Sequence, residues 1–71
     1  MPYATNTDLP ASVREHLPPH ARDIFRAAYN HAWEQYADHS DREAVCNRVA
    51  WAAVKRKYHK IDDTWVPLEE Y

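Results

Sequence analysis

The sequence predicts a mainly α-helical fold: a compact three-helix domain with a small two-stranded antiparallel β pair formed by the N- and C-terminal segments. The 71 residues include no glycine, the residue that most often supplies the positive φ angles of tight hairpins and helix ends. Two long stretches carry apolar side chains at helical spacing, and prolines set a shorter helical stretch apart from them. At this length we expect one domain spanning residues 1–71.

The first helix is predicted in the stretch DLPASVREHLP. Asp8 can accept hydrogen bonds from first-turn amides, and Pro10 fits a first-turn position that needs no donor. Pro18 and Pro19 end this helix, because the residue before a proline is pushed out of the helical region.

The second helix is predicted at 19–37, with Pro19 at its start. At 100° per residue one broad sector is apolar, and the polar side chains fall on the other side. Small residues at the centre of this sector, flanked by aromatic ones, favour close approach of a neighbouring helix. The sector contains Ala21, Ile24, Phe25, Ala28, Tyr29, Ala32, Trp33 and Tyr36.

The third helix is predicted at about 41–60, with Ser40 and Glu43 forming a capping box at its start. Around Ala52 the helix should be exposed, and cationic side chains gather on that side. The inner arc is predicted to hold Cys46, Ala50, Trp51, Ala53, Val54 and Tyr58, with Val49 at one margin.

The two ends of the chain have extended character. The stretch DDTWVP indicates a turn followed by a short strand that Pro67 limits, and PYAT lies near the N-terminus. We expect these segments to pair with each other, and Tyr3 and Trp65 to pack onto the helices. A two-stranded pair depends on such packing because it is marginal by itself.

Charge is unevenly distributed along the chain. Three arginines against six acids give residues 1–41 a net charge of −3, and residues 61–71 carry −4. Between them, residues 42–60 carry +5, although the whole chain has a formal charge of −2. This basic segment between two acidic ones indicates an asymmetric surface.

A cationic face on the third helix is the strongest candidate for a binding site. Two explanations remain open: cations near a helix C-terminus interact favourably with the helix dipole, or the face docks an acidic partner or nucleic acid. The dipole accounts only for the last turn, and Arg48 lies two turns earlier. The candidate partner- or nucleic-acid-binding residues are Arg48, Lys55, Arg56, Lys57 and Lys60.

Few side chains suggest catalysis or metal binding. His16 and His20 are four residues apart, but two prolines interrupt the helix that would align them, and His31 with Glu34 supplies only two ligands. Cys46 has no likely base beside it and is interpreted as an apolar filler. We therefore predict no metal, no cofactor and no enzymatic activity.

Four blocks of sequence resemble the ChaB family of small bacterial proteins, which also has relatives in insect viruses. In order, they are MPYATNTDLP, LPPHARDIFRAAYNHAWEQY, VAWAAVKRKY and DDTWV. The resemblance implies three helices with a small antiparallel sheet, and a non-enzymatic regulator of a cation/proton antiporter. It also implies possible DNA binding, because viral relatives are suspected DNA binders.

These observations predict a regulatory protein whose basic third-helix face docks an acidic protein surface or a cytosolic transporter loop. The alternative is a nucleic-acid-binding accessory protein that uses the same face, and a third hypothesis is a structural adaptor that uses the acidic tail. MPYATNTDLP lacks the features of a signal peptide, and no apolar run approaches the roughly 18 residues that span a bilayer. We expect no membrane insertion and a cytoplasmic location, or the host cytosol or nucleus if the protein is viral.

Overall fold

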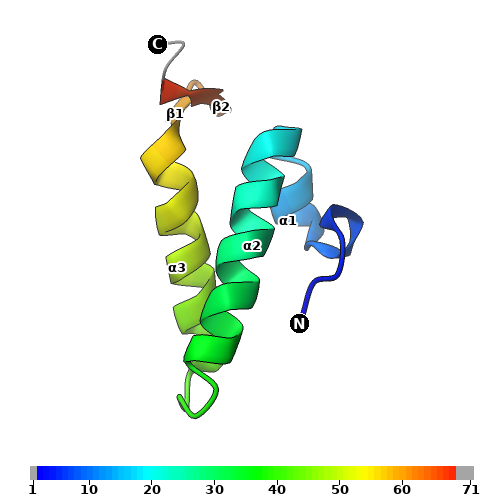
Figure 1. The fold of residues 1–71 in the computed structure, drawn as a ribbon. Coiled ribbons are helices and arrows are strands. Elements are labelled where there is room, and N and C mark those ends of the chain that lie inside the picture. Colours follow the sequence, from blue (N-terminus) through cyan, green and yellow to red (C-terminus); the bar gives the residue numbers. More distant parts are fainter. Residues whose placement is uncertain (1, 69–71) are drawn as a thin grey trace.

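Residues 2–68 are described by a computed structural model, in which two long helices lie side by side and a short hairpin follows the second (Figure 1). The short helix α1 lies beside α2, away from α3. The predicted mainly α class with three helices and a two-stranded antiparallel sheet is confirmed. The elements are η1 (Asn6–Asp8, a 3₁₀ turn), α1 (Ala11–Arg14), α2 (Pro19–Gln35), α3 (Arg42–Lys57), β1 (Tyr58–Ile61) and β2 (Thr64–Pro67).

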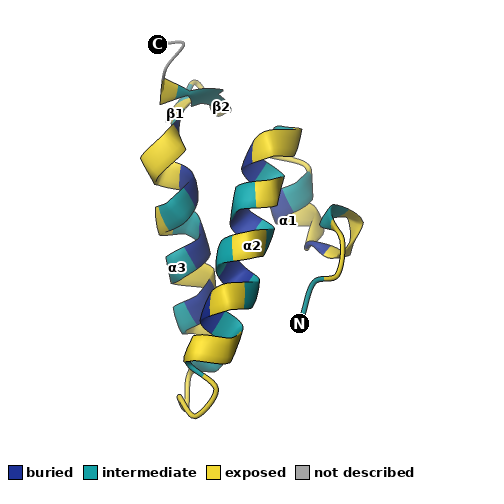
Figure 2. Ribbon diagram, viewed as in Figure 1, coloured by how far each residue is buried: buried dark blue, intermediate teal, exposed yellow. Residues whose placement is uncertain are grey.

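The core lies along the seam where α2 faces α3, and α1 packs against the other side of α2 (Figure 2). The predicted apolar sector of α2 is confirmed, and every member of it is either buried or packed against the core. On α3, Val49 and Trp51 are half-buried and pack against the core, and Ala53 is half-buried. The buried residues are Leu9, Val13, Leu17, Ala21, Phe25, Tyr29, Ala32, Cys46, Ala50, Val54 and Tyr58.

The helix starts differ in part from the prediction. Pro19 begins α2 as expected. The capping box of Ser40 with Glu43 is wrong, because Asp41 holds the N-cap position of α3 and makes no side-chain capping bond. Asp8 does not cap the first α-helix as predicted. Its carboxylate instead accepts a hydrogen bond from the Thr5 N–H, at 3.1 Å, at the start of η1.

The sheet does not join the two ends of the chain, so the predicted pairing of N- and C-terminal segments is wrong. Instead β1 and β2 are consecutive antiparallel strands joined by a two-residue turn. Asp62 and Asp63 form this turn with φ angles of 50° and 67°. Positive φ at both turn residues is typical of the two-residue hairpin turns whose twist matches that of the flanking strands. Closing so short a loop costs far less conformational entropy than bringing two distant ends together.

The N-terminal segment is instead held along α2. Asn30 accepts the Tyr3 N–H through Oδ1 at 3.2 Å and donates to the Tyr3 carbonyl through Nδ2 at 2.7 Å. Arg26 donates to the Ala4 carbonyl at 2.6 Å. These side chains satisfy the main-chain groups that a strand partner would have satisfied. The Tyr3 ring packs on Tyr29, with ring centroids 4.8 Å apart, as predicted.

Helix α3 is shorter than the predicted 41–60. It ends at Lys57, because Tyr58 is extended with φ −135° and ψ 156°. Lys60 therefore belongs to β1 and not to the helix, which corrects its predicted place on the third-helix face. Among the helices within residues 2–68, none has the length and apolarity needed to cross a bilayer.

The seam between α2 and α3 predicts how two alanines on one helix should differ. Ala50 is completely buried in the seam, whereas Ala52 is exposed on the opposite side of α3. We expect Ala50→Leu to reduce the free energy of unfolding by about 1–3 kcal/mol through overpacking. The matched control Ala52→Leu should stay within about 0.5 kcal/mol of the wild type. Denaturant unfolding measures both, and equal effects would contradict the assigned seam.

Candidate partner-binding surface

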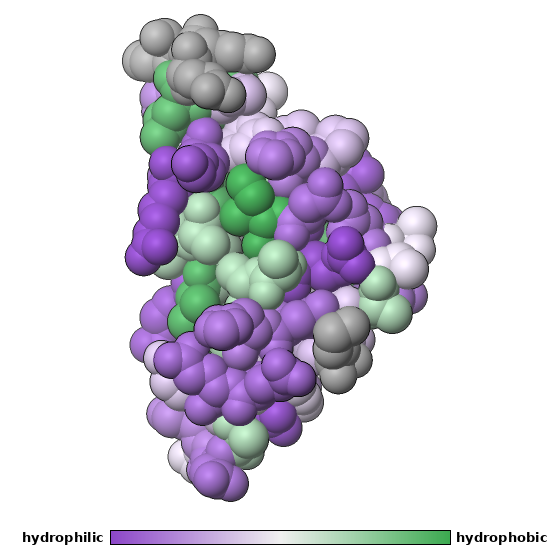
Figure 3. Space-filling model, viewed as in Figure 1, coloured by the Kyte–Doolittle hydropathy of each residue, from purple (hydrophilic) through white to green (hydrophobic). Residues whose placement is uncertain are grey.

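Arg48, Trp51 and Lys55 form a stripe along the outer side of α3, and we call these three residues the α3 stripe. Arg48 and Lys55 are exposed, and Trp51 is half-buried between them. All three line one shallow hollow together with Ala44, Asn47 and Ala52. The seven-residue separation places the two cations about 10.5 Å apart along the helix axis. In the view of Figure 3, hydrophilic residues cover most of α2 and α3, and hydrophobic surface gathers in the seam between them.

Arg56 and Lys57 are exposed but lie elsewhere. Eight residues of helix rotate Arg56 about 80° away from Arg48, and Lys57 is rotated further still. Both line a different hollow, next to His20 at the start of α2 and Pro67 of the hairpin. The structure therefore divides the predicted cations into two groups.

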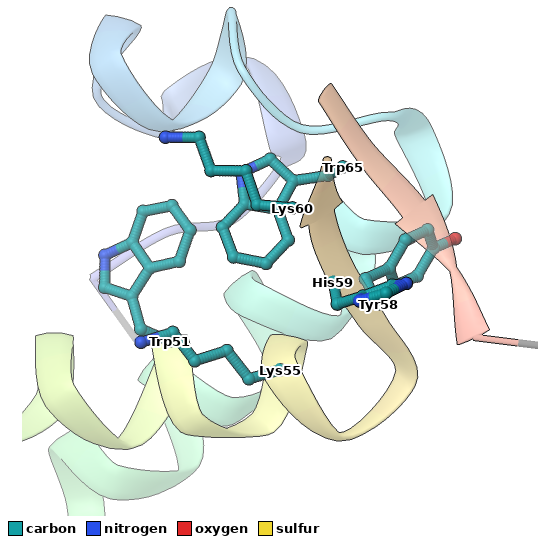
Figure 4. A pocket seen from close by; sticks show the side chains of 6 residues that line it. All are labelled: Trp51, Lys55, Tyr58, His59, Lys60 and Trp65. Atoms are coloured by element: carbon teal, nitrogen blue, oxygen red, sulfur yellow. The ribbon is translucent and has the colours of Figure 1, made fainter. Parts of the chain in front are cut away.

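Lys60 joins the group that contains Lys55. It lies opposite Trp65 across the hairpin, and its ammonium is 3.8 Å from the Asp63 carboxylate, with half of the Lys60 side chain exposed. An exposed pair of this kind contributes at most about 1 kcal/mol. Lys55, Lys60, Trp51 and Trp65 line one hollow (Figure 4).

The cations on the later turns of α3 differ in their bonding from the other arginines, including Arg42 at the start of the helix. Within residues 2–68, no hydrogen bond or ion pair involves the side chains of Arg48, Lys55, Arg56 or Lys57. In contrast, Arg42 donates to the Trp33 carbonyl and lies 3.7 Å from the centroid of the Trp33 ring. The guanidiniums of Arg14, Arg22 and Arg26 also donate to main-chain carbonyls. Cations available to a partner therefore concentrate on α3 and β1.

The hollow at the hairpin was not anticipated from the sequence. Both tryptophans were expected to serve the core, and both pack against it while remaining half-buried. Trp65 packs on Trp51 as predicted, with centroids 5.7 Å apart and 29° between the ring planes. Lys60 and Trp65 each lie two residues from the Asp62–Asp63 turn. Facing residues of a hairpin project from the same side of it, so this spacing could have indicated the site.

The groups considered for metal or thiol chemistry have other surroundings. Within the described part of the chain, no three His, Cys, Asp or Glu side chains come close enough to hold a metal ion. His16 contacts the Ser12 carbonyl through Nδ1 at 2.6 Å. Cys46 is completely buried, and desolvation raises the pKa of its thiol, although Arg42 acts in the opposite direction. A buried thiol held in its protonated form is a poor nucleophile.

The fold and these side chains define a small helical domain with a cationic, tryptophan-containing surface on one side. The chain belongs to the ChaB family, whose model matches residues 9–68. This confirms the family resemblance of the sequence.

Proteins of known sequence and structure agree with this assignment. The chain is 52 % identical over 69 residues to the "Putative cation transport regulator ChaB" of Escherichia coli strain K12, covering 89 % of this chain and 91 % of the relative. A protein with the same name from Shigella flexneri matches to the same extent. The solution NMR structure of a ChaB protein bearing that description superposes with a TM-score of 0.83 at 49 % identity, covering 93 % of this chain and 97 % of the other.

Buried Tyr29 predicts a loss of stability at alkaline pH. Desolvation, with smaller contributions led by Tyr3, raises the pKa of Tyr29 from 10.0 to about 12. The folded protein retains a proton that the unfolded chain releases, so the stabilisation is complete below pH 10 and is lost as pH rises from 10 to 12. Between pH 9 and pH 11 we expect this group to reduce the free energy of unfolding by roughly 1 kcal/mol.

Denaturant unfolding at the two pH values tests this expectation. Tyr29→Phe is the matched variant, because it keeps the ring and removes the titrating hydroxyl. Its free energy of unfolding should change less between pH 9 and pH 11 than that of the wild type. Equal changes in both proteins would show that Tyr29 does not carry the effect.

Proposed function

We propose that this chain is a non-enzymatic regulator of cation transport that binds an acidic segment of a partner protein through the α3 stripe and Lys60. The observation that carries the proposal is the exposure of Arg48 and Lys55 on one side of α3 with no internal partner within residues 2–68. The family relationship supports the regulatory role, because the relatives are named for cation transport.

The charge distribution supports an acidic partner. Residues 42–60 carry a net charge of +5 between acidic flanks. Arg42 already contacts Trp33, so the positive charge available to a partner lies on the later turns of α3 and on the hairpin. The approximately 10.5 Å between Arg48 and Lys55 along the helix axis matches about three residues of a peptide in the polyproline II conformation. Side chains three residues apart lie on the same side of such a segment, so two acidic residues at that spacing would pair with both cations at once.

Binding of this kind is expected to be fast, salt-sensitive and of modest affinity. Exposed ion pairs contribute at most about 1 kcal/mol each and are screened by salt. Complementary charge mainly raises the association rate and selects against wrong partners. These properties suit a reversible regulator.

Nucleic acid is the alternative ligand for the same cations. On duplex DNA, contact with two phosphates by the α3 stripe would give a salt slope of only about −1.8. The acidic pair Asp62 and Asp63 adjoins Lys60 and would repel a polyanion that continued past the hairpin. A protein segment therefore fits the surface better, and DNA serves as a competing probe.

The binding test compares two charge reversals on the same helix. The probes are a labelled peptide with acidic residues at every third position, labelled duplex DNA and labelled single-stranded DNA, each at about 50 and 200 mM salt. Arg48→Glu/Lys55→Glu should weaken peptide binding at least about tenfold at the lower salt, because it replaces two attractions by two repulsions. Arg56→Glu/Lys57→Glu, with the same change of charge, should weaken it less than about threefold.

Equal losses in the two variants would indicate non-specific attraction and contradict a defined stripe. Tighter binding of DNA than of the peptide would favour the nucleic-acid alternative. Circular dichroism and thermal unfolding provide the control that both variants remain folded.

The regulatory role needs a separate measurement in cells. Deleting the gene in the source organism should alter the rate of cation efflux, and the wild-type gene or Arg56→Glu/Lys57→Glu should restore it. Arg48→Glu/Lys55→Glu at equal protein abundance should not. Unchanged efflux of Na⁺, K⁺ and Ca²⁺ after deletion would contradict the role in cation transport.

A further inference from the structure

A hollow with an aromatic floor and a cationic rim lies where α3 meets the hairpin. It has a volume of about 610 Å³ and is lined by Trp51, Lys55, Tyr58, His59, Lys60 and Trp65. Figure 4 shows the two indoles beside one another, Trp51 from α3 and Trp65 from the hairpin, with Lys55 and Lys60 on either side of them. The hollow continues the α3 stripe, because Trp51 and Lys55 line both.

The two tryptophans supply apolar surface that the fold itself does not fully use. Trp51 meets Phe25 of the core edge-on, with centroids 5.1 Å apart, and packs on Trp65 along another side. Both rings nevertheless remain half-buried. Partly exposed tryptophan in a concave site is typical of the residues that dominate binding energy at protein interfaces.

The lysines determine what kind of ligand suits this surface. Lys55 is exposed, and half of the Lys60 side chain is accessible. Long lysine side chains cover aromatic surface with their methylene groups while their ammonium groups stay in water. An apolar side chain entering the hollow would therefore pass between two positive charges, which favours carboxylates on its neighbours.

A nucleic-acid base is a poorer occupant than a peptide side chain. One face of each indole is already covered by the other indole, which leaves no gap between them for a base to stack in. Asp62 and Asp63 are exposed at the hairpin turn, next to Lys60. A nucleic acid carries a phosphate at every nucleotide and would bring negative charge to this acidic turn. A peptide can carry carboxylates at just those positions that lie beside the cations.

We propose that the hollow anchors one aromatic or aliphatic side chain of an acidic peptide segment, whose carboxylates lie along Arg48, Lys55 and Lys60. This inference rests on the proposed function and adds the chemistry of the partner: an acidic segment interrupted by one large apolar residue. Charge brings the segment to α3, and burial of the apolar residue against Trp51 and Trp65 fixes its position.

Three labelled peptides of equal length test the anchor. The first is acidic with one central phenylalanine, the second has serine in its place, and the third keeps the phenylalanine but replaces the acids by glutamine. The wild type should bind the first about tenfold or more tightly than the second, as expected for burying one large apolar side chain. The uncharged third peptide should bind more weakly than the first.

Variants assign the effect to the hollow. Trp65→Ala should weaken binding of the phenylalanine peptide to the level of the serine peptide, so that the variant no longer distinguishes the two peptides. Arg48→Glu/Lys55→Glu should weaken both. In the wild type, the indole N–H resonances of Trp51 and Trp65 should shift more with the phenylalanine peptide than with the serine peptide, which tests the anchor even if Trp65→Ala does not fold.

The possible failures are distinguishable. Equal binding of the phenylalanine and serine peptides, with no difference in indole shifts, would overturn the anchor and leave the charge-based function intact. Binding of neither peptide would overturn both. Retention of the phenylalanine preference in a folded Trp65→Ala protein would place the apolar contact outside the hollow and also overturn the proposal.

Discussion

Small side chains line the seam between α2 and α3, and their size determines how the helices meet. Ala21, Ala32 and Ala50 have no exposed surface, and side chains of this size allow helix backbones to approach closely. Phe25 and Tyr29 fill the space beside them. Because packed interiors tolerate little change in volume, this seam fixes the rotation of α3 about its axis. The direction of every outward-facing cation on α3 follows from that rotation.

The hairpin extends α3 in a different secondary structure. Tyr58 remains in the core while the backbone leaves the helix there, so the chain turns without losing its apolar contact. The stack of Trp65 on Trp51 then ties the hairpin to the helix. Two strands alone would be marginal, and the indole contact gives them a supporting surface. The same contact creates the concave end of the cationic surface.

Helical periodicity predicted which sides of α2 and α3 are buried, since that pattern depends on spacing along one element. It correctly placed Arg48, Lys55 and Ala52 in solvent. It did not predict where α3 ends, because Tyr58 suits a helix and a strand equally well as a buried residue. Lys60 was therefore assigned to the wrong element.

Contacts between distant segments were the hardest to predict. The extended residues near the N-terminus were expected to pair with a strand, but their main-chain groups form hydrogen bonds with the side chains of Asn30 and Arg26 on α2. A polar residue on the outer side of a helix gives no signal in the sequence that it will bind backbone 27 residues away. Likewise, periodicity assigned Trp51 inward without indicating that α2 would cover only part of its ring. The role of the cationic surface remains a prediction.

The hydrogen bonds that join Asn30 and Arg26 to the main chain of residues 3 and 4 have an evolutionary consequence. Both side chains contact main-chain atoms, which every amino acid carries, so these hydrogen bonds depend little on the side chains of the segment, and only the Tyr3 ring adds a side-chain contact, with Tyr29. Ala4 is exposed and is therefore free to vary among relatives, whereas Asn30 is constrained, since only Asn and Gln carry an acceptor and a donor in one planar amide and Gln is one methylene longer. Selection at this end of the molecule should act on the helix that holds the segment and on Tyr3, and only weakly on Ala4.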